Sequence, residues 1–257
     1  MAASISVQDL TFRYASVDVL HGISFDIAPG EVTGLLGPNG AGKSTTIKIL
    51  TGILEPLSGR VVVAGLDLPS QALALKQRVG YVPEAAELYE TLSAREFLEL
   101  CGRLHELDER TLATRIDAML EAFDLADRGH GSLGSFSKGM RQKVLIAAGL
   151  LHNPEVVFLD EPLTGLDVES AVFVKTLLAA LAADGRTILY SSHVLDVVER
   201  ICTRVLIIDK GRLVADGSPD ALKTRASETS LEAVFREVTR AESAEPRVAR
   251  ILAGLRS

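Results

Sequence analysis

A glycine-rich segment followed by a lysine and a serine is the part of the sequence best suited to binding phosphate. Residues 37–44 read Gly-Pro-Asn-Gly-Ala-Gly-Lys-Ser, which matches the pattern Gly-x-x-x-x-Gly-Lys-Ser/Thr without a gap. Glycines let backbone amides turn inward around a phosphate chain, where a Cβ atom would obstruct them. Lys43 can neutralise the charge of β- and γ-phosphates, and the hydroxyl of Ser44 can hold Mg²⁺. The segment therefore predicts a nucleoside-triphosphate site.

Two acids and a histidine stand where they could act on such a nucleotide. Asp160 and Glu161 end the apolar run that begins at Val156, and ligands of open α/β folds bind at the carboxyl edge of the sheet. Asp160 is suited to Mg²⁺, directly or through water, and Glu161 can polarise an attacking water. His193 follows another apolar run, and its imidazole could contact the γ-phosphate. A lone histidine is as often structural, so position alone does not assign it.

Short apolar runs separated by helix-like stretches indicate the framework that positions these residues. Four largely apolar runs occupy residues 31–37, 79–82, 156–160 and 187–192. Such strands are usually buried on both faces, as in a parallel sheet covered by helices. By contrast, residues 5–12 and 23–27 alternate between apolar and polar, which predicts antiparallel strands with one solvated face. Residues 205–216 predict a hairpin that turns at Lys210-Gly211.

Helical spacing predominates in the middle of the chain, from about Ser93 to Arg128. Ser93 and Glu96 fit a capping box, in which the serine oxygen accepts from the third amide and the glutamate reaches back to the cap. We interpret this region, about residues 90–150, as a helical subdomain inserted into the sheet domain.

The last part of the chain also carries helix signals. Ser218-Pro219 begins a helix, with proline at its first position. The predicted fold class is therefore α/β: a P-loop NTPase core with a mainly parallel sheet, an N-terminal antiparallel β subdomain and the inserted helical subdomain. These parts occupy residues 1–220, and residues 221–257 form a helical C-terminal extension.

Composition and charge exclude several classes of protein. The chain has 257 residues, of which 47% are hydrophobic, which is too apolar for disorder over most of its length. Its formal charge of −7 gives no general attraction to nucleic acid or anionic lipid. Apolar runs reach only about eight residues, whereas a membrane span needs roughly 18–20, so we expect a cytosolic chain. Cys101 and Cys202 fit two buried free thiols better than one disulfide.

With these residues together, the sequence resembles the ATP-binding subunit of an ABC transporter over nearly all of residues 4–220. The motifs follow the family's order: Walker A at residues 37–45, the signature at 136–140, Walker B at 156–161, the D-loop at 163–167 and the switch histidine at position 193. The resemblance implies that ATP is bound by Tyr14, Gly37, Pro38, Asn39, Gly40, Ala41, Gly42, Lys43, Ser44, Thr45, Glu84, Ser137, Gly139, Asp160 and Asp167. It also implies Mg²⁺ on Ser44, Glu84 and Asp160, and catalysis by Glu161, His193 and Lys43.

The resemblance further implies a head-to-tail dimer, with like or unlike subunits, that holds ATP at its interface. Ser137 and Gly139 of one subunit would cap the γ-phosphate held by the other, from a helix N-terminus. The γ-phosphate would thereby favour the closed dimer until hydrolysis removes that bias. The expected partner is an integral membrane permease, which places this chain on the cytoplasmic face of the cell membrane, with no nucleic-acid partner.

The sequence departs from the family pattern at three positions. Glu84 stands where most members have glutamine, Lys138 replaces the signature's usual glycine, and Met140 replaces its usual glutamine. Glu84 adds negative charge beside the phosphates, whereas Lys138 opposes the helix dipole but favours a nearby phosphate. The change at Glu84 and the changes in the signature resemble the subfamily that powers type-2 export permeases for drugs, antibiotics, polysaccharides or lipids. We therefore expect the ATP-hydrolysing subunit of an exporter.

Two other functions remain as alternatives. A soluble ABC ATPase acting on ribosomes or DNA usually has two cassettes or long coiled-coil arms, and this sequence shows neither. A regulatory subunit that senses nucleotide without hydrolysing it finds support only in Glu84 and Lys138.

Overall fold

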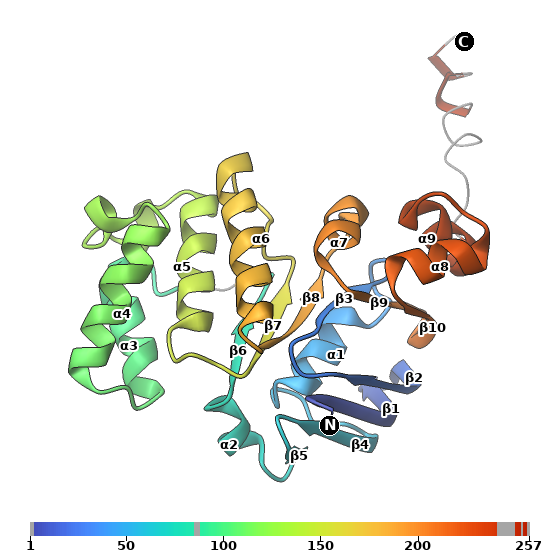
Figure 1. Ribbon diagram of the computed structural model, residues 1–257, viewed down its shortest axis with the longest axis horizontal. Helices are drawn as coiled ribbons and strands as arrows, with labels where there is room; N and C mark the ends of the chain where they lie inside the picture. Colours follow the sequence, from blue (N-terminus) through green and yellow to red (C-terminus); the bar gives the residue numbers. More distant parts are fainter. Residues whose placement is uncertain (1–2, 85–87, 241–249, 253, 256–257) are drawn as a thin grey trace.

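The computed structural model describes residues 3–84, 88–240, 250–252 and 254–255, and its framework is two β-sheets with helices around them (Figure 1). The larger sheet has six strands in the order β10-β9-β3-β8-β7-β6. Its strands are β3 (Val32–Leu36), β6 (Val79–Val82), β7 (Val156–Asp160), β8 (Thr187–Ser191), β9 (Arg204–Asp209) and β10 (Arg212–Gly217). All neighbours are parallel except β9 and β10, which pair as an antiparallel hairpin. The predicted parallel sheet and hairpin are therefore confirmed.

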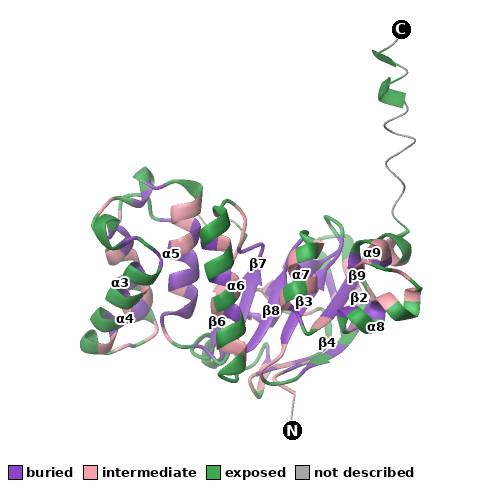
Figure 2. Ribbon diagram, turned by 45° about the horizontal axis from the view of Figure 1, so that its top comes forward, coloured by how far each residue is buried: buried purple, intermediate pink, exposed green. Residues whose placement is uncertain are grey.

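The two faces of this sheet bury different sets of side chains. In β7, Val157 and Leu159 join the core under the helices, whereas Val156 and Phe158 join the core shared with the N-terminal sheet. All five residues of β7 are buried, as the purple strands of Figure 2 show. Burial on both faces explains why the run is apolar throughout rather than alternating.

The smaller sheet is antiparallel and has the order β2-β1-β4-β5. Its strands are β1 (Ile5–Tyr14), β2 (Val17–Ile27), β4 (Ser58–Val63) and β5 (Leu66–Leu68). The two predicted antiparallel strands are confirmed as β1 and β2, which pair with each other, but β2 begins at Val17, earlier than the alternation indicated. The sequence did not predict β4 and β5, because the first three residues of β4 are exposed and β5 is only three residues long. Helix α1 (Lys43–Leu50) packs in the core that joins the two sheets.

Helices α3 (Ala94–Leu104), α4 (Glu109–Ala122) and α5 (Lys138–Leu150) lie together between β6 and β7 in the chain, at the left of Figure 1. A short helix, α2 (Ala72–Lys76), precedes β6, and the 3₁₀ turns η1 (Ala126–Arg128) and η2 (Leu133–Ser135) connect α4 to α5. The capping box of α3 is confirmed. The amide of Glu96 donates to Ser93 Oγ at 3.2 Å, and the amide of Ser93 donates to Glu96 Oε2 at 2.7 Å.

The helices that follow are α6 (Val168–Ala183), α7 (Leu195–Ile201), α8 (Pro219–Ala226) and α9 (Leu231–Thr239), and residues 250–252 and 254–255 are also helical. Helix α8 begins where the sequence indicated, because Ser218 Oγ accepts from the amide of Ala221 at 3.2 Å. Part of the predicted C-terminal extension, residues 241–249, 253 and 256–257, lies outside the described residues.

Both cysteines are free thiols, as predicted. Burial raises the pKa of Cys101 to about 11 and that of Cys202 to about 12, so both stay protonated at neutral pH. Cys202 is buried, whereas Cys101 is only partly so. Within the described residues, the helices are too short or too polar to cross a bilayer.

Candidate nucleotide site

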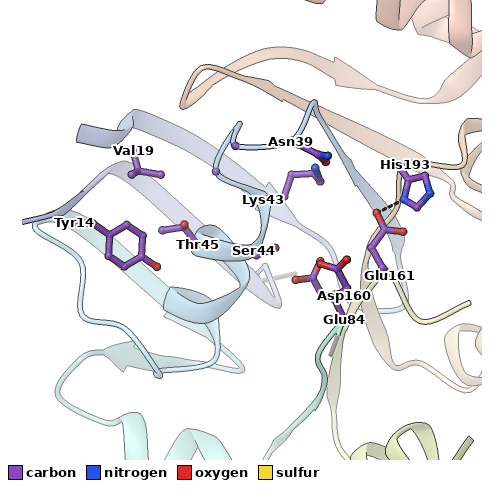
Figure 3. Close-up of a pocket in the computed structure, with 12 residues that line it drawn as sticks. Tyr14, Val19, Asn39, Lys43, Ser44, Thr45, Glu84, Asp160, Glu161 and His193 are labelled. Carbon is purple, nitrogen blue, oxygen red and sulfur yellow. Dashed lines mark ion pairs between the residues drawn. The ribbon is translucent and has the colours of Figure 1, made fainter. Parts of the chain in front are cut away.

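The glycine-rich loop joins the end of β3 to the start of α1 (Figure 3). A Cβ atom at Gly37 would lie 2.2 Å from the backbone oxygen of Ile208, so only glycine fits there. Gly42, the residue before α1, has a φ of 109°, a left-handed conformation that glycine adopts without strain. The loop therefore has this shape because neighbouring strands approach its backbone closely and because its glycines permit unusual dihedral angles.

Lys43 begins α1 and lies folded back beneath the loop. Its Nζ donates to the carbonyl oxygens of Gly37 at 2.7 Å and Pro38 at 3.2 Å, and the residue is 8% exposed. Burial lowers the pKa of Lys43, and the nearby carboxylates of Glu161, Asp160 and Glu84 act in the opposite direction. A buried ammonium beside three carboxylates can take further anionic oxygens as acceptors when a phosphate enters.

Asp160 is the last residue of β7 and Glu161 follows it, and their side chains point differently, as Figure 3 shows. Asp160 is 3% exposed and accepts a hydrogen bond from the hydroxyl of Ser191, in β8, at 2.7 Å. Glu161 has a φ of 50°, which is uncommon for a residue other than glycine, and its amide donates to the Ser191 carbonyl at 3.1 Å. Backbone strain of this kind concentrates at functional sites, where it fixes the direction of a side chain.

His193 contacts Glu161 directly. Nδ1 of the imidazole lies 2.8 Å from Glu161 Oε1; the histidine side chain is 67% exposed and the glutamate side chain 10%. The loop that carries His193 is fixed by Ser192, whose Oγ accepts from the amide of Val194 at 3.0 Å. The structure thus supplies the partner that sequence position alone could not assign to this histidine.

These elements surround a cavity of about 680 Å³, within the range typical of ligand sites. It is lined by Tyr14, Val19, Asn39, Gly40, Gly42, Lys43, Ser44, Thr45, Glu84, Asp160, Glu161 and His193. Sequence reasoning had selected all of these except Val19, which lies in the part of β2 that the alternation did not indicate. Tyr14 closes one end of the cavity, with its ring edge-on to Phe12 at 4.8 Å between centroids.

Six predicted residues lie outside the cavity lining. Three of them, Gly37, Pro38 and Ala41, belong to the glycine-rich loop but do not line the cavity. Ser137 caps α5 by accepting from the amide of Met140 at 3.2 Å, and Asp167 caps α6 by accepting from the amide of Ser170 at 2.8 Å.

The sixth, Gly139, packs against the loop before α6. A Cβ atom there would meet the backbone oxygen of Gly165 at 2.6 Å. A single chain therefore does not bring Ser137, Gly139 or Asp167 to its own nucleotide cavity.

Residues 20–164 match the protein-family model described as ABC transporter. The chain is 39% identical to the daunorubicin resistance ATP-binding protein DrrA3 of Streptomyces coeruleorubidus, over 91% of this chain and 74% of that protein. It is 37% identical to the Nod factor export ATP-binding protein I of Burkholderia lata, over 86% of this chain and 72% of that protein. A solved ATP-binding subunit of an ABC transporter matches with a TM-score of 0.86 and 34% identity, over 91% of this chain and 99% of that one. The chain belongs to the ABC transporter family, as an ATP-binding and ATP-hydrolysing subunit.

Proposed function

We propose that this chain hydrolyses ATP with Mg²⁺ to energise an exporter, working with a separate membrane permease at the cytoplasmic face of the membrane. The observation that carries the proposal is the cavity that combines Lys43 with the contact between Glu161 and His193. The names of two relatives support export, since one is a daunorubicin resistance ATP-binding protein and the other a Nod factor export ATP-binding protein.

The proposed roles follow from which atoms face the cavity. Lys43 binds β- and γ-phosphate oxygens, and the loop amides and the N-terminus of α1 bind the rest of the chain of phosphates. Glu161 accepts hydrogen bonds from the attacking water and takes up its proton. His193 holds Glu161 in place through Oε1 and remains exposed enough to reach the γ-phosphate.

The donor set fits Mg²⁺. Ser44, Glu84 and Asp160 present one hydroxyl and two carboxylates to the same cavity, and Mg²⁺ prefers oxygen ligands of this kind. Among the described residues, no three His, Cys, Asp or Glu side chains are grouped to hold a metal by themselves. Mg²⁺ would take most of its ligands from phosphates and water, and it would supply charge neutralisation when bound.

A second subunit, identical or not, completes the site in this proposal. Ser137 and Gly139 stand at the N-terminus of α5 and would meet the γ-phosphate held by the other subunit, with Asp167 beside that interface. Residues 1–220 form the cassette, with the helical subdomain at about residues 90–150, and residues 221–257 form its extension. The net charge of −7 gives no support to a nucleic-acid partner.

The permease would dock in a second cavity, of about 580 Å³, between the sheet and the inserted helices. Its lining is mainly apolar and includes Ile53, Leu73, Phe97 and Leu104. Leu73 is 81% exposed and Leu104 is 70% exposed, although both are large apolar side chains. Contiguous apolar surface of this kind marks an interaction site, and a membrane protein's cytoplasmic helix has the matching chemistry.

Turnover is tested with the Glu161→Gln variant. Wild type should hydrolyse ATP with Mg²⁺ at least about a hundredfold faster than the variant, because the amide is a far weaker proton acceptor. ATP binding should be equal in both, since Glu161 does not hold the phosphates. Equal rates in the two proteins would instead favour the nucleotide-sensing alternative.

The partner is tested by capture from solubilised membranes. Tagged Glu161→Gln with ATP should retain a polytopic membrane protein, and Leu104→Glu introduced into it should lose that protein while still binding ATP. Val172→Glu is the matched control, because Val172 is 56% exposed and does not line the apolar cavity. Capture of ribosomes or DNA would support the other alternative.

A further inference from the structure

Helix α7 is short, and it starts two residues after His193. Its position therefore determines where the histidine loop ends. On one side α7 rests on the sheet: Val198 is fully buried, and a Cβ atom on Gly34 of β3 would lie 2.6 Å from Val198 Cγ1. This contact fixes the distance of α7 from β3, but a seven-residue helix needs a second contact to fix its direction.

The second contact comes from the C-terminal extension, through Glu199 of α7. Glu199 Oε1 lies 2.7 Å from Nζ of Lys223, in α8, and Oε2 accepts from the amide of Leu231, the first residue of α9, at 3.3 Å. The ammonium of Lys223 lowers the pKa of Glu199, so the carboxylate is charged at neutral pH. A negative charge at the N-terminus of α9 is also favourable to the helix dipole.

Apolar packing supports the same junction. Leu231 and Val234 of α9 are 0% and 1% exposed, and they belong to the same core as Val198 of α7. Figure 1 shows α8 and α9 next to β10, on the side of the fold that also carries α7. Helix α7 is thus held between β3 and the extension.

We propose that the segment 218–239 holds α7 in place and thereby keeps His193 in contact with Glu161, with Glu199 as the positioning residue. The imidazole is exposed apart from that contact, so its location depends on the backbone that leads into α7. The expected effect on ATP turnover rests on the proposed function, because His193 acts on the reaction through Glu161. A displacement of about 1 Å in a catalytic group can cost up to 100-fold in rate, and a loosened α7 should cost about tenfold.

The test compares Glu199→Gln with Asp220→Asn. The first variant keeps the shape of the side chain and removes its charge. The second removes the charge of Asp220, whose Oδ1 lies 2.9 Å from Lys223 Nζ on a side chain that is 92% exposed, and it leaves Glu199 unchanged. Histidine ring signals are recorded by NMR on the protein without nucleotide, and the His193 signal is assigned with His193→Ala. Turnover and ATP binding are then measured with Mg²⁺.

Glu199→Gln should move the His193 signal and lower kcat about tenfold, with ATP affinity unchanged within about twofold, since the phosphate loop is untouched. Asp220→Asn should match wild type in all three measurements. An unmoved His193 signal, an equal loss of kcat in both variants, or a loss of ATP affinity parallel to kcat would each overturn the proposal. If wild type hydrolyses no ATP, the proposed function fails, and the His193 signal alone decides the inference.

Discussion

Two stacked histidines lead us to expect that acid lowers the stability of this fold. Substituting one of them should remove this loss. The rings of His105, at the end of α3, and His152, after α5, lie parallel at 3.7 Å between centroids. His152 Nε2 lies 3.0 Å from the carbonyl oxygen of Val79, the first residue of β6, which makes Nε2 the protonated nitrogen of the neutral ring. Nδ1 of each ring is buried and has no hydrogen-bond partner among the described residues. Protonation at Nδ1 would therefore bury an unpaired charge.

Burial, together with the charges of His105 and Arg115, lowers the pKa of His152 from 6.5 to about 4, and the bond to Val79 only partly offsets this. Between these values the unfolded chain binds a proton that the folded chain does not, so stability falls as the pH drops from 6.5 to about 4. The full difference between the two pKa values of His152 corresponds to about 3.4 kcal/mol of folding free energy. Because the ring is partly exposed, solvent screening reduces the expected loss to about 1–2 kcal/mol.

The assay is urea unfolding at pH 7.5 and pH 4.5 for wild type, His152→Gln and His130→Gln. The glutamine amide can still donate to the Val79 carbonyl but does not titrate in this range. His130 is exposed, so its substitution is the matched control. Wild type and His130→Gln should lose about 1–2 kcal/mol more on acidification than His152→Gln. Equal losses in all three proteins would refute the reasoning, since the carboxylates that also titrate are common to all.

Three further predictions follow from single contacts. Gly37→Ala should weaken ATP binding about tenfold or more, measured with a fluorescent nucleotide, because its Cβ meets the carbonyl oxygen of Ile208; unchanged affinity would contradict this close approach. Ser93→Ala should lower the free energy of unfolding by about 1 kcal/mol in urea, since it removes the hydroxyl of the α3 capping box, and no change would mean that water replaces the cap. Leu231→Ala should lower that free energy by about 2–4 kcal/mol, because the side chain is fully buried; a loss below about 1 kcal/mol would show that α9 is dispensable to the core.

Most of the fold and site could be predicted because the signals lie close together in the chain. The glycine loop with Lys43, the acids after β7 and the cap at Ser93 each depend on residues within one turn or one strand end. The contact of His193 with Glu161 could not be predicted, because it joins loops after two different strands and depends on their pairing. Strand β4 was missed for a related reason, since half of it is exposed and it is held by pairing with β1 rather than by its own apolar residues.

The hydrogen bonds of Lys43 have a consequence for the thermodynamics of nucleotide binding. Because Nζ donates to two carbonyl oxygens of its own loop, the loop and the lysine restrict each other's conformations. Binding then exchanges intramolecular acceptors for phosphate oxygens instead of ordering a disordered side chain. The loop loses its conformational entropy during folding rather than during binding. The affinity for the phosphates therefore depends on this preorganisation and on the difference between the hydrogen bonds of Lys43 to the loop and those to phosphate oxygens.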